Sequence, residues 1–165
     1  PQRIMVIRFM VDMLICAMLC AILGYKLPDV QLAGRLLIRG CTFCGYLVLF
    51  WMQLHSCLPL GDGVVILVAT CPVFTVALCK LILSEEIPTG WLVQTFLCTV
   101  GALLVHPPTN ADLNCPASTS LFPIGAAFCG GLMILQSREL KEVPSPMLVL
   151  FTDIVCALYA MMHVL

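Results

Sequence analysis

The chain has 165 residues, of which 61% are hydrophobic and only 10% are charged. A soluble domain is typically ~45–50% apolar and ~25% charged, so this chain has too few polar groups to cover the surface of a globule in water. Its eight basic and nine acidic residues give a net charge of -1 without a basic cluster, which argues against a nucleic-acid partner. The composition therefore excludes a water-soluble fold and favours helices that lie in lipid.

Six apolar segments of membrane-spanning length follow one another, separated by short connectors that are polar or contain Pro and Gly. Closed β-barrels also span membranes, but their strands alternate in polarity, and runs such as Val64 to Ala69 do not. We therefore predict an all-α, multi-pass transmembrane helical bundle. The predicted spans are 4–23, 36–57, 61–83, 90–106, 121–137 and 146–165.

The ends of the chain and its basic residues indicate how it is organised. It begins at Pro1 and stops at Leu165 inside an apolar run, so we expect a fragment of a longer protein. The first span is too long for the apolar core of a signal peptide. Basic residues gather in or near the loops 24–35, 84–89 and 138–145, which predicts that these loops face the cytosol.

Two cysteines fall on the opposite side of the predicted topology. Cys57 and Cys115 then face the lumen or the exterior, where a disulfide can form. Spacing alone does not show that their sulfur atoms meet. The pair is therefore a candidate disulfide.

Charged residues inside the spans are the first candidates for a functional site. Arg8 and Asp12 lie four residues apart, on one face of the first helix, where they can pair. Such a pair within a membrane indicates an ion or substrate path, and the alternative is a structural, partly hydrated pair near the outer end of the helix. Asp153 either faces a cavity or pairs with a helix beyond this chain.

A proline in the third span is the second candidate. Pro72 lies at the middle of 61–83, where it leaves the carbonyl near Val68 without its usual donor. Transporters place substrates at such interrupted helices, and Thr70 and Thr75 would add hydroxyl groups there. The alternative is an ordinary kinked helix whose free carbonyl is satisfied by a neighbouring hydroxyl.

The sequence carries no pattern typical of an enzyme or a metal site. Cys41 and Cys44 have the C-x-x-C spacing but no second cysteine pair, and the three histidines, at 55, 106 and 163, lack the H-x-x-x-H spacing. We therefore expect no catalytic residues, no metal and no cofactor. A membrane enzyme whose turnover depends on His55 or His106 is the least favoured hypothesis.

Small residues indicate where helices meet. Pairs with four-residue spacing predict close helix contacts, and they are Ala126 with Gly130, Ala127 with Gly131, and Cys41 with Gly45. In Gly61-Asp62-Gly63 we expect Asp62 to be the N-cap of the third helix.

Several short motifs occur in an order found in one transporter family. They are Arg8-Phe9, Arg39-Gly40, Leu58-Pro59-Leu60-Gly61-Asp62-Gly63, Pro72-Val73-Phe74-Thr75, Leu83-Ser84-Glu85-Glu86, Gly101 through Val105 with Pro107-Pro108, and the segment from Gly125 to Arg138. Their order resembles the EamA domain of the drug/metabolite transporter superfamily, and within it the G-type branch of solute carrier family 35.

The resemblance implies ten helices in two inverted five-helix repeats around a cavity with alternating access. On this basis 1–106 would be the first repeat without its first helix, 107–120 the loop between the repeats, and 121–165 the start of the second repeat. The chain departs from the family at Gly63, where many relatives have Ala. It also lacks a clear counterpart of the cavity lysines of nucleotide-sugar carriers, because Lys80 lies near the cytosolic end.

We therefore expect a fragment of a membrane transporter that moves a small organic solute, with a non-transporting membrane regulator of the same fold as the alternative. The expected cavity residues are Arg8, Asp12, Thr70, Pro72 and Thr75. The resemblance adds Glu85 and Glu86 at the cytosolic end, which could also be loop charges or pair with Lys80. The expected partners are membrane lipid and the solute, and a homodimer is left open. The membrane is either the plasma membrane or an endomembrane of the Golgi or ER.

Overall fold

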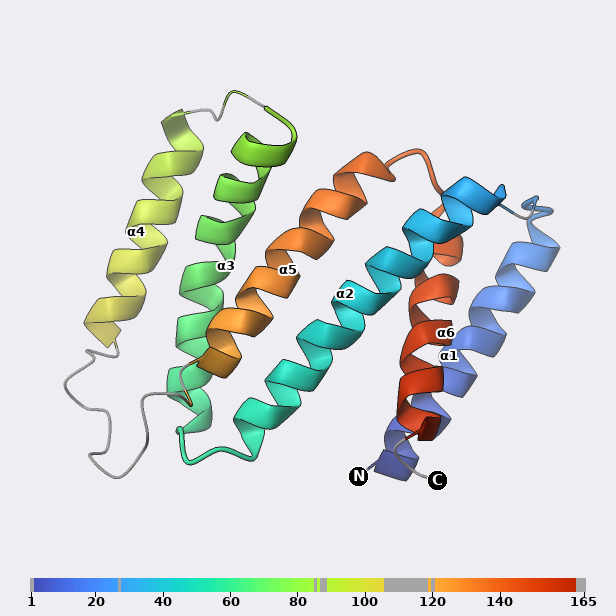
Figure 1. The fold of residues 1–165 in the computed structure, drawn as a ribbon, viewed down its shortest axis with the longest axis horizontal. Coiled ribbons are helices and arrows are strands. Elements are labelled where there is room, and N and C mark those ends of the chain that lie inside the picture. The colour runs from blue at the N-terminus through green and yellow to red at the C-terminus, as the bar shows by residue number, and fades with distance from the viewer. Residues whose placement is uncertain are drawn as a thin grey trace. The chain divides into compact units, whose positions relative to one another are not determined.

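A computed structural model describes residues 2–26, 28–84, 86, 89–105, 119 and 121–162. In this part of the chain the fold consists of six α-helices and no strands (Figure 1). The predicted all-α class is thus confirmed for the described residues. The helices are α1 (Gln2–Ile22), α2 (Val30–Leu54), α3 (Leu60–Ile82), α4 (Thr89–Val105), α5 (Leu121–Glu139) and α6 (Ser145–Met162).

Four of these helices are long and apolar enough to cross a membrane, namely α2, α3, α5 and α6. Their outer surfaces carry large apolar side chains, and Val30 and Leu81 are 84% and 78% exposed, as expected for surfaces that meet lipid. α4 has 17 residues, a length of about 26 Å at 1.5 Å per residue. The remaining two predicted spans, which correspond to α1 and α4, stay predictions.

The start of α2 differs from the predicted span. The helix begins at Val30, six residues before the predicted boundary at 36, and ends at Leu54 instead of 57. Asp29 explains the early start, because its carboxylate accepts a hydrogen bond from the Val30 N–H and its carbonyl accepts one from the Ala33 N–H, both at 2.8 Å. Arg35 therefore lies in the helix, and the predicted loop 24–35 is wrong in its second half.

The start of α3 corrects the predicted role of Asp62. Pro59 holds the N-cap position, makes no side-chain capping bond, and precedes the first helical residue, Leu60. Asp62 lies in the first turn instead, so its prediction as N-cap is wrong. A carboxylate in the first turn still interacts favourably with the positive end of the helix dipole.

The chain forms two compact units, which are described separately. The first consists of Pro1–Cys44 and Gln136–Leu165, and the second of Gly45–Leu135. In the first unit α1 packs along α6 (Figure 1). An apolar cluster of Leu36, Leu140 and Met147 joins α2, the turn after α5 and the start of α6.

In the second unit α3 packs against α4 (Figure 1), and α5 also packs closely against α3. Ala126 and Ala127 are fully buried and form a cluster with Leu67 of α3. At Gly131 a β-carbon would lie 3.1 Å from the backbone nitrogen of Thr75. The contacts predicted for the small residues of α5 are thus confirmed, whereas Cys41 of the third predicted pair is exposed.

Candidate functional site

In the first unit a polar cluster surrounds Arg39, a half-buried residue of α2. Its Nε donates a hydrogen bond to Ser137 Oγ at 3.1 Å, and its Nη1 donates one to Thr152 Oγ1 at 2.9 Å. Thr152 is only 6% exposed. The guanidinium of a helix that is long and apolar enough to span a membrane is therefore held by two neutral hydroxyl groups from α5 and α6.

Glycine at position 40 explains why α2 and α6 approach closely enough for these bonds. A β-carbon there would lie 2.8 Å from Val155 Cγ2 and 3.1 Å from the Phe151 carbonyl oxygen, both on α6. β-carbons in proteins essentially never come within 3.0 Å of a heavy atom from another part of the structure. The absence of a side chain at Gly40 thus brings the neighbouring Arg39 within reach of Thr152.

Two further contacts order the cluster. The Thr152 hydroxyl donates to the Leu148 carbonyl of its own helix at 2.8 Å, which directs its lone pairs outward to Arg39. One turn along α2, Thr42 Oγ1 lies 2.7 Å from Gln136 Oε1 of α5. A second polar contact thus joins α2 and α5 one turn from Arg39.

Asp153 follows Thr152 in the sequence but lies on another face of α6, because successive helical residues are about 100° apart. It is 5% exposed and lies within electrostatic range of Arg8 and Asp12 on α1. Its Oδ2 has no hydrogen-bond partner among the described residues. In that part of the chain it forms no ion pair with Arg39.

The predicted contact between Arg8 and Asp12 is confirmed. Arg8 Nε lies 3.8 Å from Asp12 Oδ2, and the two side chains are 78% and 44% exposed. A pair this open contributes about 0–1 kcal/mol in water. Its role as a substrate path stays a prediction.

The three candidate residues of α3 belong to the second unit. Thr70 and Thr75 flank Pro72, and their hydroxyls donate to the carbonyls of Ile66 and Cys71 at 2.7 and 2.9 Å. Each hydroxyl thus bonds to its own helix. Neither hydroxyl donates to the Val68 carbonyl, so the cavity role of these residues and the alternative of an ordinary kinked helix both stay predictions.

Glu85 lies outside the described residues, and Glu86 is exposed. Within the described part, Glu86 forms no ion pair with Lys80. Ser84, which precedes the glutamates, has a φ of 50°, the left-handed conformation that often ends a helix.

Cys57 is disulfide-bonded in the structure. Cys115 lies outside the described residues, so the pairing of these two cysteines stays a prediction. Nine other cysteines are free thiols. The side of the membrane on which Cys57 lies stays a prediction.

The described residues contain no group of three His, Cys, Asp or Glu side chains that could hold a metal ion. His55 Nδ1 lies 2.9 Å from the Trp51 carbonyl oxygen of the preceding turn, a typical arrangement at a helix end. His106 and His163 lie outside the described residues.

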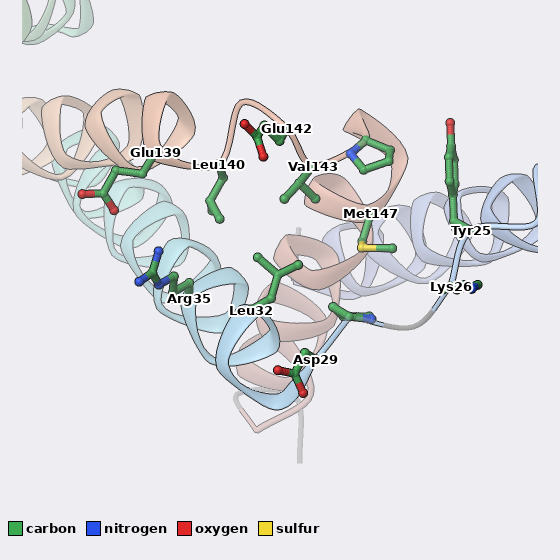
Figure 2. Close-up of a pocket in the computed structure, with 12 residues that line it drawn as sticks. Tyr25, Lys26, Asp29, Leu32, Arg35, Glu139, Leu140, Glu142, Val143 and Met147 are labelled. Carbon is green, nitrogen blue, oxygen red and sulfur yellow. The ribbon is translucent and has the colours of Figure 1, made fainter.

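An open pocket of about 580 Å³ lies at the loop end of the first unit (Figure 2). It combines the apolar side chains of Leu32, Leu140, Val143 and Met147 with charged residues of both signs, which are Lys26, Asp29, Arg35, Glu139 and Glu142. Its lining residues come from residues 25–26 and 28–29, the first turns of α2, the end of α5 and residues 140–147. The sequence did not indicate that these segments form a common pocket.

A scan against protein-family models and searches of curated proteins and solved structures find no match to this chain.

Proposed function

We propose that the chain is part of a multi-pass membrane transporter of the drug/metabolite type, which moves a small organic solute by alternating access. The observation that supports this proposal most directly is the polar cluster around Arg39 in α2, a helix apolar enough to span a membrane. Ionisable residues are costly inside membranes and are concentrated along substrate and ion pathways.

The order of the family-like motifs supports the finer part of the proposal. The six helices would correspond to the second helix of one five-helix repeat through the second helix of the next. In such carriers the repeats rock around a site near the middle of the membrane. The contact of the small residues of α5 with α3 is suited to this role, since close helix packing lets a bundle move as a rigid body.

Reconstitution into liposomes tests the proposal. The protein, and the longer reading frame implied by ten helices, would be assayed with labelled organic cations, anions and neutral solutes. We expect saturable flux of one class, with a loss of about tenfold or more in Arg39→Ala, the loss expected from removing a charged hydrogen bond. The candidates Arg8→Ala and Thr75→Val would be measured beside it.

Lys141→Ala is the matched control, because Lys141 is exposed in the connection after α5. Its flux should equal that of the unmodified protein. A folded protein that moves none of these solutes would contradict the transporter proposal and favour the non-transporting regulator.

A further inference from the structure

We propose that Arg39, together with Ser137, Thr152 and Gln136, forms a binding site for an oxyanion group, either a carboxylate or a phosphate. The inference deepens the proposed function. Only the assignment of the oxyanion to the transported solute rests on that function. The binding itself can be measured without transport.

The hydrogen-bonding capacity of the guanidinium is the first argument. Arginine carries five N–H donors in a planar fork, and Arg39 uses its Nε and Nη1 for Ser137 and Thr152. The guanidinium makes no further hydrogen bond among the described residues. The donors that remain can hold two oxygen atoms of one ligand side by side, which is the geometry of carboxylate and phosphate recognition.

The charge of the site is the second argument. Both protein acceptors of Arg39 are neutral, and in the described part of the chain the guanidinium lies in no ion pair. A half-buried cation without a counter-charge is costly in a medium of low dielectric constant. An anionic ligand would remove this cost, whereas a cationic ligand would be repelled.

The third argument is Gln136, the residue that precedes Ser137 on α5. Gln136 Oε1 lies 2.7 Å from Thr42 Oγ1, whose single hydroxyl hydrogen also lies within reach of the Ile38 and Arg39 carbonyl oxygens of its own helix, each at 2.9 Å from Oγ1. The amide nitrogen of Gln136 has no hydrogen-bond partner among the described residues, so its two N–H groups remain available as donors. Arg39 and Gln136 therefore offer donors to a ligand that accepts hydrogen bonds, as an oxyanion does.

Two sources could supply the oxyanion, a soluble solute or the headgroup of an anionic lipid. Inorganic phosphate serves as the soluble probe and glycerol as the uncharged one, each titrated into the full-length protein in nanodiscs of phosphatidylcholine. A second set of nanodiscs contains phosphatidic acid. The measured quantity is the midpoint of thermal unfolding, from which the apparent affinity follows by mass action.

We expect phosphate to raise the midpoint in phosphatidylcholine nanodiscs and glycerol to leave it unchanged. Arg39→Gln should weaken phosphate binding by at least about tenfold, the loss expected for a charged hydrogen bond. Arg35→Gln is the matched control, because Arg35 is an exposed arginine one turn earlier on α2, and it should bind phosphate as the unmodified protein does. Should Arg39→Gln fail to fold, Ser137→Ala keeps the charge and should still weaken binding.

Each result decides between the alternatives. No stabilisation by phosphate or phosphatidic acid, or equal stabilisation of Arg39→Gln and the unmodified protein, overturns the site. Stabilisation by phosphatidic acid alone assigns the oxyanion to lipid and overturns the solute assignment. Phosphate binding without flux of any solute upholds the site and contradicts transport. Flux that is independent of Arg39 upholds transport and contradicts the site.

Discussion

The side-chain amide of Gln53 lies against the backbone of Gly63, in the space that a β-carbon at position 63 would occupy. Gln53 is 1% exposed, and neither atom of its amide has a hydrogen-bond partner among the described residues. The contact joins the end of α2 to the first turn of α3. It also gives a physical reason for glycine at position 63.

Replacing Gly63 by Ala should destabilise the second unit. The new methyl group would overlap the Gln53 amide, which would have to leave its buried position. Overpacking of this kind costs about 1–3 kcal/mol. Equilibrium unfolding in detergent micelles would measure the change in the free energy of unfolding.

Gly34→Ala is the matched control, since nothing lies within 4 Å of a β-carbon at that position of α2. It should raise stability by about 0.5–1 kcal/mol, the usual gain of Ala over Gly in a helix. Adding Gln53→Ala to Gly63→Ala should recover part of the loss, because the double variant removes the overlap. If Gly63→Ala and Gly34→Ala behave alike, the contact has no energetic role.

The helices could be predicted from the sequence to a large extent, because apolarity over about 20 residues is a local property of the chain. The start of α2 could not, since it depends on the capping bond of Asp29 to Val30. The cluster around Arg39 was missed for a stronger reason. Its two hydrogen bonds join residues that are 98 and 113 positions apart, so it exists only after the helices have packed. The pair Arg39-Gly40 was the available signal.

Gly131→Ala should weaken the packing of α5 on α3. A β-carbon at Gly131 would lie 3.1 Å from the Thr75 backbone nitrogen and 3.2 Å from Phe74 Cβ, so the helices would have to separate slightly. We expect a loss of about 1–3 kcal/mol in the free energy of unfolding. Gly101→Ala in α4 has open space around it and is the control. A neutral Gly131→Ala would show that α3 and α5 adjust without cost.

Ser84→Gly should stabilise the end of α3. Ser84 has a φ of 50°, a left-handed conformation that costs a residue with a β-carbon roughly 1 kcal/mol and costs glycine almost nothing. The melting midpoint should therefore rise in Ser84→Gly and fall in Ser84→Val, because a β-branched residue fits this conformation least. Equal midpoints for the two variants would contradict a left-handed residue at this position.

Peptide mapping under non-reducing conditions tests the disulfide of Cys57. We expect the peptide that contains Cys57 to be joined to the one that contains Cys115, the remaining candidate from the predicted topology. Cys57→Ser should lower the stability by about 2–4 kcal/mol, as for other disulfides that close long loops. Cys98→Ser, which alters a free and exposed thiol, should not do so. Joining of Cys57 to any other cysteine would refute the pairing.

Thiol labelling from the two sides of the membrane tests the orientation. A cysteine introduced as Lys141→Cys, in the exposed connection after α5, should react with a membrane-impermeant maleimide only when the cytosolic side is open. After reduction, Cys57 should react from the opposite side, since the excess of basic residues places its loop there. In the six-span prediction an odd number of membrane crossings separates the two positions. The two cysteines must therefore react from opposite sides of the membrane. Labelling of both from one side would refute that number, and a complete reversal would refute the orientation alone.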